Sequence, residues 1–237
     1  MDPSKAEFIT KAVALERSPP AVRTKVVALS ATVRFARRKV IWSADAPATH
    51  LYVVRAGVVR EAIGEVIVGF RGRGEVVGEV SAIAAATGGE GDHHTEGIAH
   101  EEVQAYALAI EELAALLPLE PRLATRLATV AVARRRTVEQ RLACLPTRTA
   151  EARIAFAVLE LAAAFGVRDS RGVILNLRVT HRELASMVGA SRETASVTVA
   201  AWRRARLIQV EDRRFVLLDE PRLHDVALGV LAYSGRA

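Results

Sequence analysis

Hydrophobic positions divide the chain into parts with different periodicities. In the hundred residues after Pro20, short runs of β-branched and aromatic residues are separated by glycines, which is typical of strands joined by turns. From Pro121 to about Leu145, apolar residues recur at helical spacing. Helical segments then alternate with short apolar runs. The pattern predicts an α+β protein with a strand-rich N-terminal part, a long helix and a mixed C-terminal part.

The strand-rich part contains many short apolar runs at regular spacing, which favours a sandwich or barrel. A double-sheet jelly roll, or β-roll, suits a segment of this length. The runs are Val33–Phe35, Val40–Trp42, Leu51–Val54, Val58–Val59 and Val66–Val68. Before them, residues 5 to 17 predict an amphipathic helix that ends at Pro19 and Pro20, with candidate core residues Phe8, Ile9, Val13 and Leu15.

The long helix predicted from Pro121 to Leu145 follows a short helix at Glu111–Leu117. Its apolar positions alternate in steps of four and three residues, the a/d pattern of a coiled coil. We expect a dimer seam formed by Leu123, Leu127, Val130, Arg134 and Val138. Two alternatives are a neighbouring stripe that continues to Arg141 and Leu145, and packing of the helix only on its own roll. Arg134 and Arg141 suit a seam only if they are paired.

Two helices joined by a tight turn are predicted between Val179 and Ile208. Thr180 with Glu183 forms a capping-box pattern, and Gly189 suits the left-handed end of the first helix. Ser191 is a good N-cap for the second helix, which turns Ala195, Val199 and Trp202 inward. This is the helix-turn-helix pattern. Two apolar runs, Leu207–Val210 and Phe215–Leu218, flank a charged turn and predict a wing, and Leu223 to Leu231 predicts a final helix.

The exposed face of the second helix suits double-stranded DNA. Arg donates bidentately to guanine, and Glu accepts from cytosine N4, so Arg192, Glu193 and Ser196 are the candidate base-reading residues. Candidate contacts to the DNA backbone are Thr180, Ser191, Thr194, Arg203 and Arg204. The stretch from Arg178 to Arg206 holds six arginines and two glutamates. The alternative is an ordinary helical hairpin with a solvated basic face.

Composition agrees with this interpretation. The 237 residues are 51% hydrophobic and carry a net charge of +6, which is compatible with a globular protein that has a polyanionic partner. The single cysteine, Cys144, excludes an internal disulfide and an iron–sulfur cluster held by several cysteines. No apolar run approaches 18 residues, and the first residues lack a signal-peptide pattern. We therefore expect a cytoplasmic protein without a membrane partner.

Several motifs together resemble the family of the cyclic-AMP receptor protein and FNR, the Crp/Fnr superfamily of bacterial transcription regulators. They are Ser191–Thr194 in the helix-turn-helix, Leu51–Val54 with Gly57, Gly69–Glu79 and Ala150–Ala155. The resemblance implies a cyclic-nucleotide-binding-like β-roll at 1–118, a dimerisation helix at 119–145 and a winged helix-turn-helix domain at 146–237. Residues 146–149 are the expected hinge, and Phe156, Leu159, Leu161 and Phe165 the expected core face of the following helix. It also implies a homodimer on a palindromic operator and RNA polymerase as a partner.

The resemblance places the effector pocket at Gly78, Glu79, His93, His94 and Thr95. In cyclic-nucleotide-binding relatives an arginine holds the cyclic phosphate, but this chain has no arginine between Arg73 and Arg122 and aligns His93 or His94 there. A neutral imidazole does not replace a guanidinium, so we do not expect cyclic AMP to bind tightly.

A haem or metal site at His93 and His94 is less favoured than two solvated loop histidines, because neighbouring residues in a strand point to opposite faces. We therefore expect no metal or other cofactor. Two further functions remain as alternatives. One is a metal-dependent cupin-like enzyme that uses His50, His93 and His94, although we favour a protein that is not an enzyme. The other is a constitutive DNA-binding protein without an effector.

Overall fold

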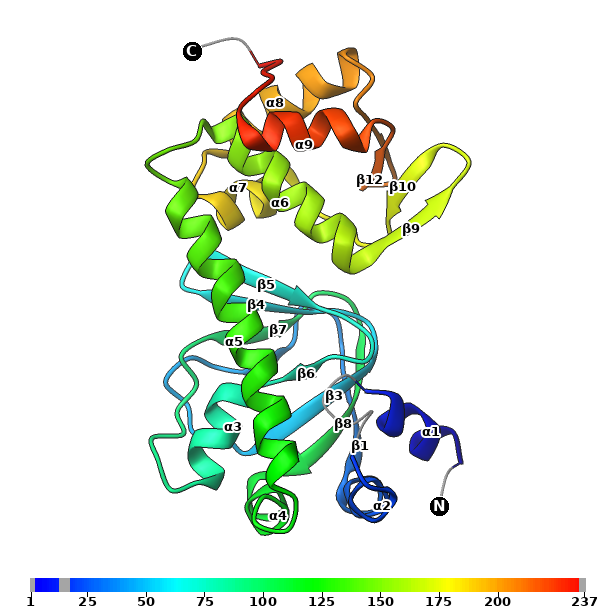
Figure 1. Ribbon diagram of the computed structural model, residues 1–237, viewed down its shortest axis with the longest axis vertical. Helices are drawn as coiled ribbons and strands as arrows, with labels where there is room; N and C mark the ends of the chain where they lie inside the picture. Colours follow the sequence, from blue (N-terminus) through cyan, green and yellow to red (C-terminus); the bar gives the residue numbers. More distant parts are fainter. Residues whose placement is uncertain (1–2, 13–17, 235–237) are drawn as a thin grey trace. The chain divides into compact units, whose positions relative to one another are not determined.

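The computed structural model describes residues 3–12 and 18–234. The chain forms two compact units, Met1–Arg136 and Thr137–Ala237, and their border lies within the long helix α5 (Pro121–Cys144) (Figure 1). The division at residues 118 and 145 stays a prediction. None of the helices in the described residues is both long enough and apolar enough to cross a membrane.

The N-terminal unit contains a jelly roll of two four-stranded antiparallel sheets, as the sequence predicted (Figure 1). One sheet has the strand order β1-β8-β3-β6 and the other β2-β7-β4-β5. The strands of the first sheet are β1 (Ala31–Phe35), β8 (Val103–Ala109), β3 (His50–Ala56) and β6 (Val76–Val77). Those of the second are β2 (Val40–Trp42), β7 (Glu96–Ala99), β4 (Val59–Ile63) and β5 (Val66–Arg71).

Strand β3 is apolar at consecutive positions because both of its faces are covered. Successive side chains of a strand point to opposite faces. Tyr52 and Val54 therefore lie between the two sheets, in a cluster with Trp42, whereas Leu51 and Val53 pack against helices on the other side. Gly57, which follows β3, has a φ of +80°, and a Cβ there would lie 1.9 Å from the Glu102 carbonyl oxygen. This position therefore requires glycine.

Helices cover the outer face of the first sheet. They are α1 (Pro3–Lys11), α2 (Pro20–Leu29), α3 (Glu79–Ala86) and α4 (Ile110–Leu116), followed by α5. Phe8 and Ile9 belong to this core as expected, whereas Val13 and Leu15 lie outside the described residues. Helix α2 was not predicted from the sequence, because Pro19 and Pro20 were expected only to end the preceding helix. Pro20 is instead the first residue of the next helix, a position where proline is favoured.

The expected dimer seam on α5 was partly wrong. Leu123 and Leu127 are fully buried in the core of their own roll, with Val130 packed beside them. Arg134 lies on the same side and is paired with carboxylates of the roll. Only Val138, which is 40% exposed, remains accessible. The a/d pattern thus marks a face of α5 that is buried. That face packs on the roll of the same chain and not on a second helix.

The C-terminal unit is built on α6 (Ala150–Phe165) and a four-stranded antiparallel sheet of order β11-β12-β10-β9 (Figure 1). Its other elements are β9 (Gly166–Asp169), β10 (Gly172–Leu175), α7 (His181–Val188), α8 (Arg192–Arg204), β11 (Ile208–Glu211), β12 (Arg214–Leu217) and α9 (Glu220–Leu228). Strands β11 and β12 form the predicted wing.

The predicted core face of α6 was only partly correct. Leu161 is buried, but Phe156, Leu159 and Phe165 are half-buried. The buried face is made mainly of small residues, with Ile154 and Val158 among them. Small side chains let α7, α8 and α9 approach α6 closely. The predicted face contained only large apolar residues and therefore differed from the buried one.

Candidate nucleic-acid interface and effector site

Helix α7 begins at a complete capping box. The Thr180 hydroxyl accepts a hydrogen bond from the Glu183 N–H at 3.2 Å, and the Glu183 carboxylate accepts from the Thr180 N–H at 2.9 Å. These two bonds satisfy backbone donors that a helix N-terminus leaves unpaired. The helix ends at Gly189, whose φ of +62° is left-handed. The predicted start and end of this helix are therefore confirmed.

Helix α8 is capped at its N-terminus and buries its inward face. The Ser191 hydroxyl accepts from the Thr194 N–H at 3.0 Å and contacts the Thr194 hydroxyl at 2.9 Å. Ala195, Val199 and Trp202 are buried, as predicted from their spacing. Ser191 and Thr194 thus lie at the N-terminus of α8, and their hydroxyls already serve the helix cap.

The outer face of α8 presents Arg192 and Glu193 on its first turn, both exposed. Val197, one turn later, is 59% exposed and belongs to the same surface. Ser196 differs from the prediction, because it is half-buried. Its hydroxyl donates to the Arg192 carbonyl at 2.9 Å and contacts Nδ1 of His181 at 2.9 Å. Its hydroxyl is therefore occupied within the protein. Arg203 and Arg204 are exposed on the last turn.

The wing is attached to the start of α7. Arg178 forms an ion pair with Asp212 in the turn between β11 and β12, and the Val179 N–H donates to the Arg213 carbonyl at 3.2 Å. Asp212 and Arg213 both have positive φ, at 47° and 61°, which is the backbone of a tight hairpin turn. The wing and the helix-turn-helix are therefore held together as one surface.

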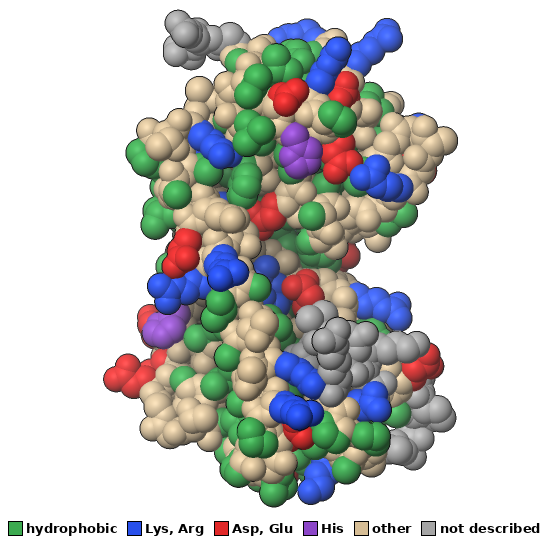
Figure 2. Space-filling view, viewed as in Figure 1, with side chains coloured by type: hydrophobic (Ala, Val, Ile, Leu, Met, Phe, Trp, Pro, Cys, Tyr) green, Lys and Arg blue, Asp and Glu red, His purple; other side chains and the backbone are tan. Residues whose placement is uncertain are grey.

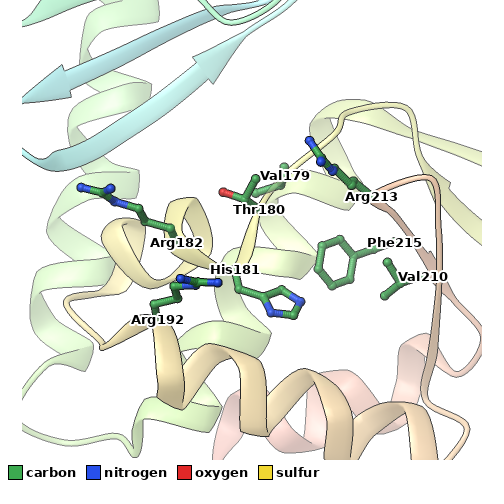
Figure 3. A pocket seen from close by; sticks show the side chains of 8 residues that line it. All are labelled: Val179, Thr180, His181, Arg182, Arg192, Val210, Arg213 and Phe215. Carbon is green, nitrogen blue, oxygen red and sulfur yellow. The ribbon is translucent and has the colours of Figure 1, made fainter.

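A hollow of about 420 Å³ lies between α7, α8 and the wing. Figure 3 shows His181 between Arg192 on one side and Val210 and Phe215 on the other, with Arg213 near the wing turn. Its lining residues are Val179, Thr180, His181, Arg182, Arg192, Val210, Arg213 and Phe215. Three of these residues, His181, Arg182 and Arg213, were not among the site residues predicted from the sequence. The sequence does hold a signal for them: His181 and Arg182 directly follow the cap residue Thr180, and Arg213 lies in the predicted wing turn.

The hollow is basic, whereas the face of the protein in Figure 2 carries charges of both signs. On the face that Figure 2 shows, Lys and Arg side chains are interspersed with Asp and Glu on both units. By contrast, three of the eight residues that line the hollow are arginines. Local charge, rather than the net charge of the chain, therefore marks the face that suits DNA phosphates.

The predicted effector position contains an ion pair between the roll and α5. Gly78 has a φ of +76° at the start of α3, and Glu79 is buried directly after it. Arg134 donates to Glu79 Oε2 at 2.6 Å, to the Val76 carbonyl at 2.7 Å and to Glu75 Oε1 at 3.3 Å. Burial raises the pKa of Glu79, and the Arg134 guanidinium opposes this effect. One guanidinium thus joins the segment before α3 to α5.

The two adjacent histidines lie in different environments, and the expectation that both are solvated was wrong. His93 is buried and stacks on Trp42 with ring centroids 5.1 Å apart. Burial lowers the pKa of His93, which favours the neutral ring. Its Cε1 would lie 3.5 Å from a Cβ at Gly78, so the ring sits directly beside the start of α3. His94 is exposed and Thr95 half-buried.

The histidines proposed for a cupin-like enzyme do not gather at one point. His50 contacts the Thr49 hydroxyl at 3.0 Å, His93 is stacked on Trp42, and His94 is exposed. Within residues 3–12 and 18–234, the structure brings no three His, Cys, Asp or Glu side chains together in a way that would hold a metal ion.

Comparisons with known proteins agree with this architecture. Residues 32–118 match the family model of the cyclic nucleotide-binding domain, and residues 152–226 match that of the Crp-like helix-turn-helix domain. The fold resembles that of FixK2 from Bradyrhizobium japonicum, with a TM-score of 0.70 at 20% identity, over 83% of this chain and 96% of that one.

Two curated relatives from Thermus thermophilus span most of the chain. The cyclic AMP receptor protein of that organism is 29% identical over 185 residues, which cover 76% of this chain and 80% of the relative. The transcriptional regulator LdrP is 30% identical over 192 residues, which cover 78% of this chain and 91% of the relative. With its roll, its winged helix-turn-helix and these relatives, the chain belongs to the Crp/Fnr superfamily and is a DNA-binding transcription regulator.

Proposed function

We propose that this regulator works as a homodimer that binds a palindromic operator through α8 and does not respond to cyclic AMP. The observation that carries the proposal is the exposed surface of Arg192, Glu193 and Val197 on a helix capped by Ser191. As a regulator without catalytic chemistry, it acts on DNA in the cytoplasm, and by family resemblance RNA polymerase is its second partner.

Base reading is assigned to the first two turns of α8. Arg192 lies just inside the cap, where the recognition helix of a helix-turn-helix first meets base edges. Val197 has no donor and suits a thymine methyl group. Because the Ser196 hydroxyl is bonded to His181 and to the Arg192 carbonyl, we now assign Ser196 to positioning rather than to base reading.

The test of this assignment is a selection from random duplex DNA with the purified protein, followed by affinity measurements. We expect Arg192→Ala to cost about 1–3 kcal/mol at the selected site and to relax the preference at one base pair of each half-site. Arg203→Ala is the matched control. Loss of a phosphate contact should lower the affinity for all DNA sequences alike and reduce the salt dependence of binding. Unchanged affinity and base preference in Arg192→Ala would refute the base-reading role.

A second copy of the chain is the proposed occupant of the outer face of α5. Ala128, Val132 and Leu142 recur there with Arg135 and Glu139 between them, at the four–three spacing of a coiled coil, and all five are exposed. Val132 is 53% and Leu142 is 63% exposed. This stripe replaces the one that contained Leu123 and Leu127, because those two leucines are buried in the roll.

The effector proposal is supported by the charges around Glu79. Glu79 and Glu75 are paired with Arg134, and a third carboxylate, Glu61, is paired with Arg71 at 2.8 Å. The three carboxylates face two guanidinium groups, and Glu61 acts electrostatically on both Glu79 and Arg134. An anionic cyclic phosphate would add a negative charge to a site already rich in carboxylates. The same ion pair favours the alternative of a regulator that needs no effector.

A further inference from the structure

His181 has one ring nitrogen whose hydrogen is assigned by its neighbours. Nδ1 lies 2.9 Å from the Ser196 hydroxyl oxygen, and that hydroxyl donates to the Arg192 carbonyl at 2.9 Å. A hydroxyl has a single hydrogen. The Ser196 hydroxyl oxygen must therefore accept a hydrogen bond from His181 Nδ1 while it donates to the Arg192 carbonyl. Both hydrogen bonds form only when Nδ1 carries a hydrogen.

The other nitrogen of His181 faces the hollow. In Figure 3, one ring nitrogen lies toward α8, and the second lies toward Val210 and Phe215. In the neutral ring, with its hydrogen on Nδ1, this second nitrogen is an acceptor. Burial, followed by the charge of Arg192, lowers the pKa of His181 and favours that neutral form in the free protein. A phosphate oxygen is also an acceptor, so the two would not bond.

The charged groups that line the hollow are all basic. They are Arg182 on α7, Arg192 on α8 and Arg213 in the wing turn, and the described lining residues include no carboxylate. Four acidic residues are neighbours of the lining residues in sequence. Glu183 bonds to Thr180 in the capping box, Asp212 pairs with Arg178, Glu211 pairs with Arg171, and Glu193 is exposed on α8. The hollow therefore attracts an anion, and one of its lining side chains is a titratable ring.

We propose that a phosphate of the DNA backbone binds at this hollow and that His181 takes up a proton to hold it. The proton comes from solvent and adds to Nε2, which then donates to a phosphate oxygen, while Nδ1–H stays bonded to Ser196. This inference rests on the proposed DNA-binding face. It makes His181 a phosphate-binding residue and makes operator affinity depend on pH.

The sign of the dependence follows from linkage. The phosphate raises the pKa of His181 in the complex, whereas in the free protein this pKa is lower than usual. Between the two pKa values, binding takes up as much as one proton per protomer. Affinity therefore rises as the pH falls, by at most about tenfold per pH unit for each protomer. Above both pKa values and below both, this contribution to the pH dependence disappears.

The experiment measures binding of two labelled duplexes between about pH 5.5 and 8.5 at constant ionic strength. One duplex carries the selected operator, and the other has a random sequence of equal length. The variants are His181→Gln, which has no titratable ring, and His181→Arg, which is always charged. His224→Gln, at an exposed histidine of α9, is the matched control. A titration of the His181 ring by NMR, with and without the operator duplex, reports its protonation directly.

We expect the wild type and His224→Gln to bind more tightly as the pH falls, and both His181 variants to lose that dependence. His181→Arg should also bind more tightly than the wild type near pH 8, since its charge is already present. The NMR titration should give a higher pKa for His181 in the complex. Operator binding with the same pH dependence in His181→Gln would overturn this inference alone. Failure of the wild type to bind either duplex at any pH would overturn the proposed function as well.

Discussion

At the scale of single residues, Glu151 contributes more to the C-terminal unit than its place in a helix suggests. This buried carboxylate accepts from Trp202 Nε1 at 2.8 Å, from the backbone N–H groups of Tyr233 and Ser234, and from the Ser234 hydroxyl at 2.7 Å. It joins α6 to the buried tryptophan of α8 and to the segment after α9. Several donors would lose their partner if it were removed.

We predict that Glu151→Ala lowers the free energy of unfolding of the C-terminal unit by about 2–3 kcal/mol, because buried donors bonded to a charged acceptor are left unsatisfied. Chemical denaturation followed by Trp fluorescence measures the loss. Glu90→Ala removes a carboxylate that is exposed, and its effect should stay within about 0.5 kcal/mol. Equal stabilities of the two variants would show that the hydrogen bonds of Glu151 make no net contribution to the free energy of unfolding.

At the scale of elements, helix α5 has two apolar faces with different roles. One face, with Leu123 and Leu127, is part of the roll. The other, with Val132 and Leu142, is exposed in the single chain, and we assigned it to a second copy. Exposed apolar residues that recur at helical spacing form a stripe that a second helix can cover.

Val132→Glu should therefore weaken dimerisation without unfolding the roll, because it places a charge at one of the apolar positions of the seam. We expect the dimer dissociation constant to rise at least about tenfold, which is about 1.4 kcal/mol, as measured by analytical ultracentrifugation. Gln140→Glu adds the same charge at an exposed position outside the stripe and should leave the dimer intact. A Val132→Glu protein that sediments as the wild type does would contradict this seam.

At the scale of the whole molecule, we propose that the regulator works without cyclic AMP. The guanidinium of Arg134 is already paired with Glu79, one of the residues of the expected effector pocket. A ligand shifts a conformational equilibrium only through a difference in its affinity for the two states. Here the arginine that would anchor a cyclic phosphate is missing from the aligned position, where His93 is buried and burial lowers its pKa.

Millimolar cyclic AMP is thus predicted to leave the melting temperature and the operator affinity unchanged, since a ligand that binds the folded state must stabilise it by mass action. A thermal-shift titration and a DNA-binding assay at matched ionic strength provide the measurements. Saturable stabilisation at micromolar cyclic AMP, together with tighter operator binding, would show that another group holds the phosphate.

Local sequence signals determined most of the fold and the outline of the DNA-binding face. Thr180 with Glu183, Gly189 and Ser191 specify the ends of α7 and α8 by hydrogen bonds and backbone angles within a few residues. Short runs of β-branched and aromatic residues, separated by turn residues, specify the strands of the roll and the wing, because such side chains suit a pleated and covered strand. The exposed place of Arg192 at the start of α8 was predictable for the same reason as the helix ends, since it follows directly from the cap.

Tertiary structure decided which partner each of the other residues has. Leu123 and Leu127 have the spacing of a seam, but they are buried in the core of their own roll, in one cluster with residues of its first sheet and of the helices that cover it. Arg134 meets Glu79 across 55 positions of sequence, and His181 meets Ser196 across 15. Spacing along a helix shows which side chains share a face, whereas the segment that packs on that face is set by how distant parts of the chain fold together.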